Sequence, residues 1–149
     1  MTDQIDRIDR RIIGALRANA RLSMAALAQT VGLSKTPVQA RVRKLEAAGI
    51  LRGYAARVDH LKLGRGHVAF VQVRLDSTRS EALAAFNRAV QAVDEIEECH
   101  MTAAGFDYLL KIRTADIGHY RRVLGETIST LPHVSTTSTY VAMEAVKDI

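Results

Sequence analysis

The sequence predicts an α+β protein with an N-terminal winged helix-turn-helix and a C-terminal ferredoxin-like βαββαβ unit. Apolar residues recur at helical spacing through the first 48 residues, and from residue 68 onward strand and helix patterns alternate in the order βαββαβ. Charge divides the chain near the same place. Residues 1–60 carry 11 Lys and Arg against 5 Asp and Glu, whereas residues 61–149 carry 10 against 11. The basic part is the one expected to meet a polyanion.

An amphipathic helix is predicted over about residues 4–18. Either Asp3 or Asp6 suits the positive N-terminal end of this helix. Its apolar residues fall at helical spacing and should pack against the helices that follow. They are Ile5, Ile8, Ile12, Ile13 and Leu16.

The next two helices form the predicted helix-turn-helix. Ser23 is placed to cap the second helix, whose apolar pattern stops at Gly32. A third helix follows over about residues 35–48, with either Ser34 or Thr36 as its N-cap. Two helices joined by a glycine-containing turn are typical of DNA-binding domains.

Residues 50–58 predict two short strands that turn near Gly53, forming a wing beside the third helix. We therefore expect residues 1–60 to be a winged helix-turn-helix DNA-binding domain. Residues 61–149 are expected to form a second domain.

The second domain is predicted to contain four strands and two helices. The strands are expected at residues 68–75, 96–103, 106–114 and 134–146. Either Thr78 or Ser80 caps the first helix of this domain, and Asp116 caps the second. The residues of the second helix and its extension that we expect to be buried are Ile117, Tyr120, Val123, Leu124, Ile128 and Leu131.

The third helix has an apolar face and a polar face. At 100° per residue, Val38, Val42 and Leu45 fall on one side. On the polar side, Arg43 and Gln39 can make bidentate contacts to guanine and adenine. The residues expected to contact DNA are Ser34, Lys35, Thr36, Gln39, Ala40, Arg41, Arg43 and Lys44. The alternative is a solvated charged face, but the preceding helix, the wing and the net charge favour DNA binding.

No catalytic or metal-binding pattern is apparent, so we expect no enzyme, no metal and no cofactor. Cys99 is the only cysteine, which excludes an internal disulfide and indicates a cytoplasmic protein. Cys99 and His100 are neighbours on a predicted strand and should face opposite ways. Glu95, Glu97 and Glu98 have no nucleophile beside them and fit a solvated acidic edge. No apolar run is long enough to span a membrane.

Five short motifs stand out along the chain: VGLSKTP at 31–37, RVRKLE at 41–46, FDYLLK at 106–111, LGET at 124–127 and LP at 131–132. Through these motifs the chain resembles the leucine-responsive/asparagine-responsive (Lrp/AsnC) family of bacterial regulators along nearly its whole length. It is particularly similar to the leucine-responsive branch and, within that branch, to activators of proline catabolism.

The resemblance implies that the second domain senses an amino acid such as leucine, proline or another small one. It also implies dimers with paired sheets, assembled into tetramers or octamers, and an effector bound at the junction between dimers. Carried over position by position, the effector-binding residues are Met101, Ala104, Gly105, Asp107, Ile117, Tyr140, Val141 and Ala142.

Chemistry supports some of these roles. The Asp107 carboxylate could hold an effector ammonium group, and turn N–H groups near Gly105 could bind its carboxylate. The family usually has Gly where Ala104 stands, so we expect Gly105 to supply a positive φ instead.

These inferences describe a cytoplasmic, effector-responsive regulator that binds pseudo-palindromic duplex DNA as a homo-oligomer. Two alternatives remain at this point. One is an architectural protein that coats DNA with little sequence preference or effector response. The other is a ferredoxin-like metabolite-binding module with a basic appendage.

Overall fold

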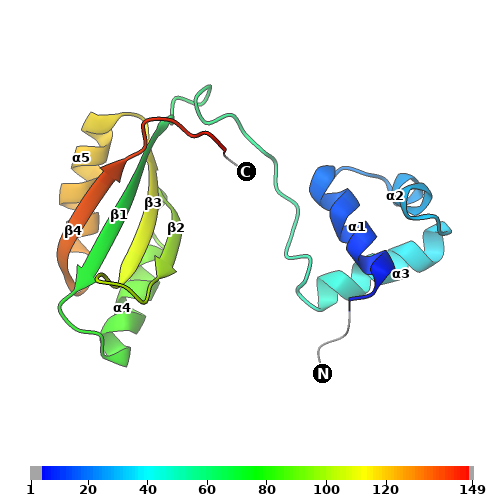
Figure 1. Cartoon of the computed structure of the whole chain (residues 1–149), viewed down its shortest axis with the longest axis horizontal. Helices are drawn as coiled ribbons and strands as arrows, with labels where there is room; N and C mark the ends of the chain where they lie inside the picture. Colours follow the sequence, from blue (N-terminus) through cyan, green and yellow to red (C-terminus); the bar gives the residue numbers. More distant parts are fainter. Residues whose placement is uncertain (1–4, 148–149) are drawn as a thin grey trace. The chain divides into compact units, whose positions relative to one another are not determined.

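The computed structural model describes residues 5–147 and separates the chain into two compact units, Met1–Arg57 and Val58–Ile149 (Figure 1). The sequence placed the domain boundary after residue 60, close to this division. Each unit has its own hydrophobic core. Within the described part of the chain, every helix falls short of the length and apolarity that a membrane span requires.

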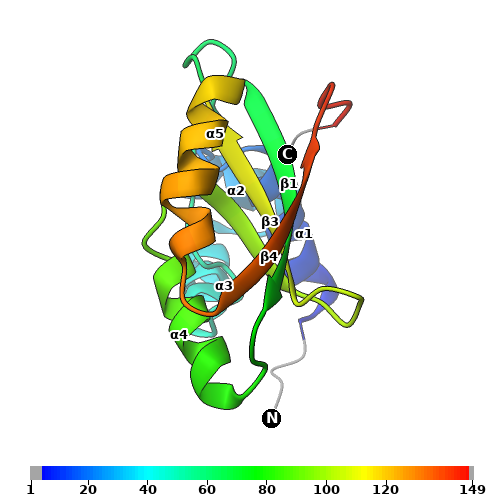
Figure 2. The same ribbon diagram turned by 90° about the vertical axis from the view of Figure 1, so that its left-hand side faces the viewer.

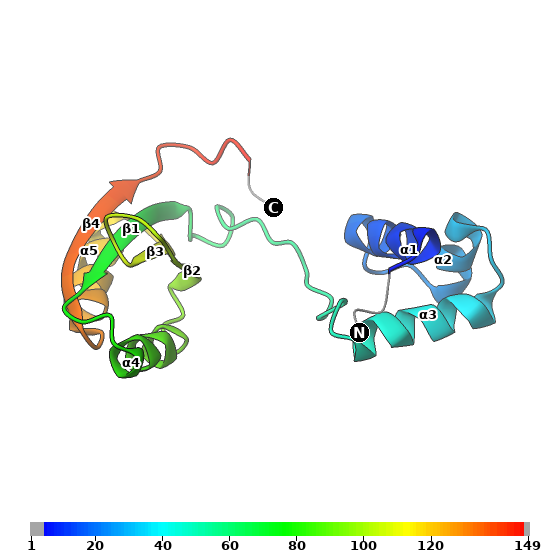
Figure 3. The same cartoon turned by 60° about the horizontal axis from the view of Figure 1, so that its bottom comes forward.

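The N-terminal unit contains three helices, α1 (Arg7–Ala18), α2 (Met24–Val31) and α3 (Lys35–Ala47) (Figure 3). Helix α1 starts later than the sequence suggested because a capping box fixes its first turn. The Asp6 carboxylate accepts a hydrogen bond from the Asp9 backbone N–H, and the Asp9 carboxylate accepts one from the Asp6 N–H. Asp3, the other candidate cap, lies outside the described residues.

The caps of α2 and α3 define the helix-turn-helix. Ser23 accepts a hydrogen bond from the Ala26 backbone N–H at 3.1 Å, as predicted for the α2 cap. Gly32 ends α2 in the left-handed conformation with φ of 75°, which favours glycine. Ser34, not Thr36, occupies the N-cap position of α3, although its side chain makes no capping hydrogen bond.

The three helices bury one apolar cluster and are also held by an ion pair. The Arg41 guanidinium on α3 lies 2.6 Å from Asp6 and 2.7 Å from Asp9, so it fastens α3 to the first turn of α1. Asp9 itself is buried. The cluster consists of Ile12, Leu16, Leu27, Ala28, Val31, Val38, Val42 and Leu45.

The predicted wing is wrong for the described chain. Leu51 packs against the core of the first unit, but residues 52–58 contain no strand and pair with no ladder. An isolated two-stranded hairpin is marginally stable, and a turn at Gly53 would leave strands of only a few residues on either side. The N-terminal unit is therefore a three-helix helix-turn-helix followed by an extended segment.

The C-terminal unit has the predicted ferredoxin-like order, and the sheet order β2-β3-β1-β4 is antiparallel throughout. Helices α4 and α5 cover one face of this sheet (Figure 2). The elements are β1 (His67–Leu75), α4 (Ser80–Val90), β2 (Ile96–Met101), β3 (Tyr108–Thr114), α5 (Ile117–Glu126), the 3₁₀ turn η1 (Ile128–Thr130) and β4 (Val134–Val141).

Alternation along β1 divides the sheet into a covered and an uncovered face. Residues 69, 71, 73 and 75 are buried under the helices, whereas Phe70 and Arg74 point the other way and are exposed. Phe70 pairs with Lys111 on β3 and with Tyr140 on β4. Among the described residues of this unit, no helix covers the second face of the sheet.

Three details of this unit differ from expectation. Arg79 occupies the N-cap position of α4 in place of Thr78 or Ser80, and makes no side-chain capping bond. Ile117 is exposed because it is the first residue of α5, one turn before the buried stripe that starts at Tyr120. Strand β4 ends at Val141, short of the predicted residue 146, and beyond it the Ala142 backbone N–H still donates to the Val68 carbonyl at 2.9 Å.

The capping box makes a pH prediction. The backbone N–H of Asp9, followed by the Arg41 guanidinium, lowers the pKa of Asp6 below its ordinary value of 3.8. The folded state favours the ionised form of Asp6. The contribution of this carboxylate to the free energy of unfolding is therefore complete above pH 3.8 and is lost as pH falls through the lowered pKa. We expect Asp6→Asn to lower the unfolding temperature of the helical unit near neutral pH and to flatten its decline in acid. Circular dichroism melts across this range measure both effects.

Asp94→Asn is the matched control, because Asp94 is an exposed acid on the other unit. An Asp6→Asn profile that follows the wild-type profile at every pH would show that the capping box contributes nothing.

Candidate functional site

Helix α3 turns its polar face to solvent. Val38, Val42 and Leu45 are buried against α1 and α2, so the opposite side of the helix is the accessible one. Gln39 lies half-buried at the edge of this surface. The exposed members of the predicted DNA-binding set are Ser34, Lys35, Thr36, Ala40, Arg43 and Lys44.

Arg41 differs from the other predicted DNA-binding residues. Its guanidinium bonds to Asp6 and Asp9 within the unit, and these two carboxylates raise the pKa of Arg41. The sequence predicted Arg41 to contact DNA, because periodicity could not reveal carboxylates contributed by another helix. Arg41 therefore has a structural role in this chain, which disfavours its predicted role as a DNA contact.

The first turn of α3 adds to this surface. Ser34 precedes the helix and makes no side-chain capping bond, and Lys35 and Thr36 at the helix start are exposed. Backbone N–H groups at the start of a helix have no intrahelical partner and attract anions, especially phosphate. The surface thus combines a phosphate-binding end with side chains capable of reading base edges.

The predicted effector residues at the β2–β3 hairpin lie together, but one is already used by the fold. The Asp107 carboxylate accepts a hydrogen bond from the Leu75 backbone N–H at 2.7 Å. The Asp107 backbone N–H donates to the Val73 carbonyl at 2.9 Å, and the Arg74 guanidinium donates to the Gly105 carbonyl. Asp107 therefore ties the hairpin to β1, whatever else it binds.

The hairpin backbone also departs from expectation. Among the described residues, positive φ values occur at His133 and at glycines 32, 49, 53 and 64. Gly105 is not one of them, so the prediction that it supplies a positive φ in place of the residue at 104 is wrong. Hydrogen bonds from Thr102 to the Asp107 and Phe106 carbonyls close the loop without a left-handed residue.

The other predicted effector residues lie at the opposite end of the sheet. Ile117 follows β3, and Val141 ends β4, where it pairs with Ala69 near the start of β1. Strand β3 separates this end from the hairpin by about 20 Å, at roughly 3.3 Å per residue. Tyr140 lies on the uncovered face and Val141 on the helix-covered side. Within one chain the two groups do not share a pocket; the members at this end are Ile117, Tyr140, Val141 and Ala142.

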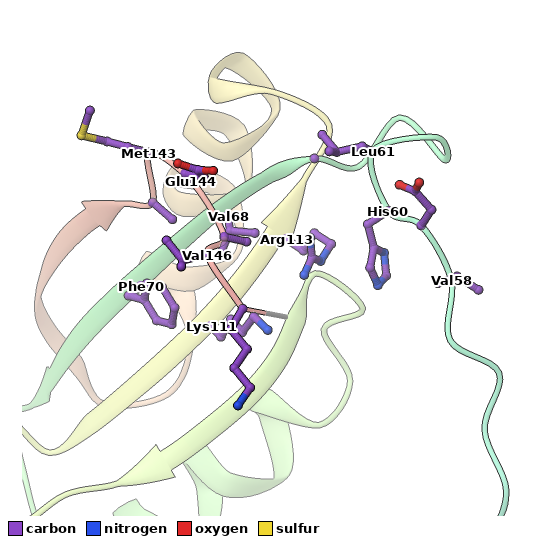
Figure 4. A pocket seen from close by; sticks show the side chains of 15 residues that line it. Val58, His60, Leu61, Val68, Phe70, Lys111, Arg113, Met143, Glu144 and Val146 are labelled. Atoms are coloured by element: carbon purple, nitrogen blue, oxygen red, sulfur yellow. The ribbon is translucent and has the colours of Figure 1, made fainter. Parts of the chain in front are cut away.

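A cavity of about 780 Å³ lies on the uncovered face of the sheet, beneath residues 142–147 and 58–61 (Figure 4). Phe70 and Val68 form part of its apolar lining. Its basic lining residues, Lys111 and Arg113, come from β3. The sequence did not predict this cavity, because no local pattern indicates that the residues after β4 and those before β1 lie over the same face.

A charged network crosses the floor of the cavity. Glu97 lies 2.5 Å from Nε of Arg113, 3.5 Å from Nζ of Lys111 and 3.9 Å from Nε2 of His60. Arg113 is only 4% exposed, so its charge is compensated inside the protein. The acidic edge expected to be merely solvated is therefore part of an ion-pair network.

Two neighbouring groups on β2 have shifted pKa values. Hydrogen bonds from His100 and Lys111 lower the pKa of Glu98, and burial raises the pKa of the Cys99 thiol. Among residues 5–147, no three His, Cys, Asp or Glu side chains are placed to hold a metal ion together.

Two family models match the chain. Residues 5–46 match the AsnC-type helix-turn-helix domain, and residues 68–149 match the Lrp/AsnC ligand binding domain. These matches coincide with the helical unit and the sheet unit described above.

Similar proteins cover almost the whole chain. A proline dehydrogenase transcriptional activator from Rhodobacter capsulatus is 56% identical over 146 residues, 98% of this chain and 95% of the relative. The leucine-responsive regulatory protein of Escherichia coli K12 is 45% identical over 143 residues, 96% and 87% of the two chains.

Solved structures agree. A transcriptional regulator–L-Met complex from Neisseria meningitidis has a TM-score of 0.89 at 27% identity, covering 97% of this chain and 94% of that chain. An AsnC family regulator from Agrobacterium tumefaciens has a TM-score of 0.90 at 33% identity, covering 96% and 93%.

Proposed function

Because the chain belongs to the Lrp/AsnC family of transcriptional regulators, we propose that α3 reads duplex DNA and that the sheet unit couples an amino acid to assembly. The chain is a DNA-binding regulator with a ligand-binding domain, and its relatives are transcriptional regulators rather than enzymes. The observation that carries the DNA proposal is the exposed polar face of α3 in the matched helix-turn-helix domain.

The proposed DNA contacts of α3 are of two kinds, those that position the helix on the duplex and those that read base edges. Lys35 and the N-terminal N–H groups of α3 suit phosphates, which fix the register of the helix on the duplex. Thr36, Ala40 and Arg43 face outward from the first turn of the helix to its middle, where base edges would lie in a major groove. The small side chain of Ala40 permits close approach, and the guanidinium of Arg43 suits guanine.

The uncovered sheet face supports self-association. Phe70 is 39% exposed and Tyr140 is 55% exposed, and they pair across neighbouring strands beside the cavity. A second copy related by a two-fold axis would place the same face against itself and bury both. We propose a homodimer formed this way, assembled further into a tetramer or octamer. Two α3 helices in such a dimer would read a pseudo-palindrome.

The separation of the effector residues supports a site shared between subunits. In one chain, the β2–β3 hairpin lies at one end of the sheet, and Ile117 and Val141 lie at the other end. Contact between the two groups therefore requires different chains. We propose that a small amino acid, with leucine and proline as first candidates, binds at such a junction. An effector changes regulation through unequal affinity for two assembly states.

The setting of this function is the cytoplasm, where the chain meets both DNA and free amino acids. The architectural alternative predicts DNA binding with little sequence preference and no response to amino acids. Competition with random duplex distinguishes the two, because a specific regulator prefers its site by orders of magnitude.

The first test separates reading from folding by comparing two arginines. Arg43→Ala should weaken binding to a selected duplex by roughly 1–3 kcal/mol and blur its base preference, with the unfolding temperature unchanged. Arg41→Ala should instead lower the unfolding temperature, because it releases buried Asp9 from its partner. Fluorescence anisotropy against selected and random duplexes, together with thermal melts, measures both. Equal loss on every sequence would make Arg43 a phosphate contact.

The second test concerns assembly. Phe70→Asp places a charge in the centre of the uncovered face beside Lys111 and should lower the molar mass in sedimentation velocity to that of a smaller species. Leu63→Asp is the control, because Leu63 is exposed in the loop before β1. An unchanged mass for Phe70→Asp would place the interface elsewhere.

The third test concerns the effector. A screen of the twenty amino acids by thermal shift should reveal one that raises the unfolding temperature. At a concentration one hundred times its Kd, such a ligand adds about 2.7 kcal/mol to the free energy of unfolding. Asp107→Asn retains an oxygen for the Leu75 N–H but loses the charge that would hold an ammonium group. We expect it to fold like the wild type and to lose the shift, whereas Asp94→Asn keeps it. An unchanged shift in Asp107→Asn would restrict Asp107 to its structural bond.

A further inference from the structure

An extended segment, residues 52–57, leaves the C-terminal end of α3; we call it the arm. The backbone N–H groups of Ile50 and Leu51 both donate to the Leu45 carbonyl, at 2.9 and 3.1 Å. Gly49, with φ of 67°, makes the turn that permits these bonds. The start of the arm is therefore fixed to the last turn of α3.

A side-chain bond holds the arm beside α3. The Tyr54 hydroxyl donates to Oε1 of Glu46 at 2.7 Å, and this hydrogen bond raises the pKa of Tyr54. Glu46 follows Gln39 by seven residues and Arg43 by three, so all three lie on one side of the helix. The arm therefore departs from the edge of the same face that we assign to DNA.

The composition of the arm suits close contact with a polyanion. Arg52 and Arg57 are exposed at its two ends, and the small residues Gly53, Ala55 and Ala56 between them add little side-chain bulk. Gly53 has φ of 146°, which a residue with a side chain rarely adopts. Extended chain of this length spans about 16 Å, well over the roughly 6 Å width of a minor groove.

We propose that the arm is a second DNA-contacting element, with Arg52 and Arg57 entering the minor groove adjacent to the major groove occupied by α3. This inference rests on the proposed role of α3. A segment leaving the end of a helix in the major groove meets the flanking backbone and then the minor groove. A narrow A·T-rich minor groove carries enhanced negative potential and attracts arginine. The arm thus gives the protein a preference for A·T base pairs beside the sequence read by α3.

The experiment uses the full chain and one duplex selected by it from a random library, remade with either A·T or G·C base pairs in the flanks. Wild type should bind the A·T version about tenfold more tightly, and netropsin, which occupies A·T minor grooves, should remove that advantage. Arg52→Ala should bring the ratio between the two duplexes close to one and reduce the slope of log K against log salt by about one.

Two further variants define the mechanism. Tyr54→Phe removes the bond to Glu46 without changing charge and should reduce the A·T preference by part of the effect of Arg52→Ala. Arg121→Ala, an exposed arginine of the other unit, should leave the ratio unchanged. Thermal melts establish that each variant is folded.

The outcomes separate the arm from the function on which it depends. If the wild type binds no selected duplex, the role of α3 itself fails. If the wild type binds but Arg52→Ala keeps the full A·T preference, the arm is not a minor-groove element. If Arg52→Ala weakens both duplexes equally, the arm contacts phosphates and the minor-groove assignment is overturned.

Discussion

The apolar seam of α3 is the constraint on which the DNA-binding unit depends. Val38, Val42 and Leu45 must be buried for three short helices to share a core, and their burial sets the rotation of the helix about its axis. Burial of these three residues is sufficient to turn the polar face of α3 to solvent. Arg41, on the boundary between the faces, fixes this rotation further through Asp6 and Asp9 on α1. In the proposed function, Arg41 contributes stability and Arg43 contributes recognition from the same helix.

A second constraint acts in the other unit, where two helices can cover only one face of a four-stranded sheet. On the uncovered side the ion pairs of Glu97 contribute to the sheet unit, but Phe70 and Tyr140 stay exposed there. A single chain therefore leaves apolar surface that a second copy can bury. The same geometry separates the two groups of predicted effector residues, so in the proposed function both assembly and ligand binding require contact between different chains.

Sequence patterns predicted what depends on local periodicity. The helices, the four strands of the sheet unit and their order along the chain, the Ser23 and Asp116 caps and the α3 seam follow from spacing and capping chemistry. Contacts between distant segments were not predictable. The carboxylates that bind Arg41 lie on another helix, and the cavity lies between strands and segments far apart in the chain. The wing failed for a related reason, because strand-like residues near Gly53 form a ladder only when a partner is available.

The connection between the units carries contacts at both of its ends. Tyr54 bonds to Glu46 on α3, while His60 lies near Glu97 and residues 58–61 border the cavity on the sheet. Because this segment is the covalent path from α3 to β1, ordering it at one end reduces the conformational freedom left at the other. An assembly state that holds residues 58–61 therefore changes the entropy that the arm must lose when it binds. Coupling between ligand and DNA then needs no change within either core, only a difference in how firmly this short stretch is held.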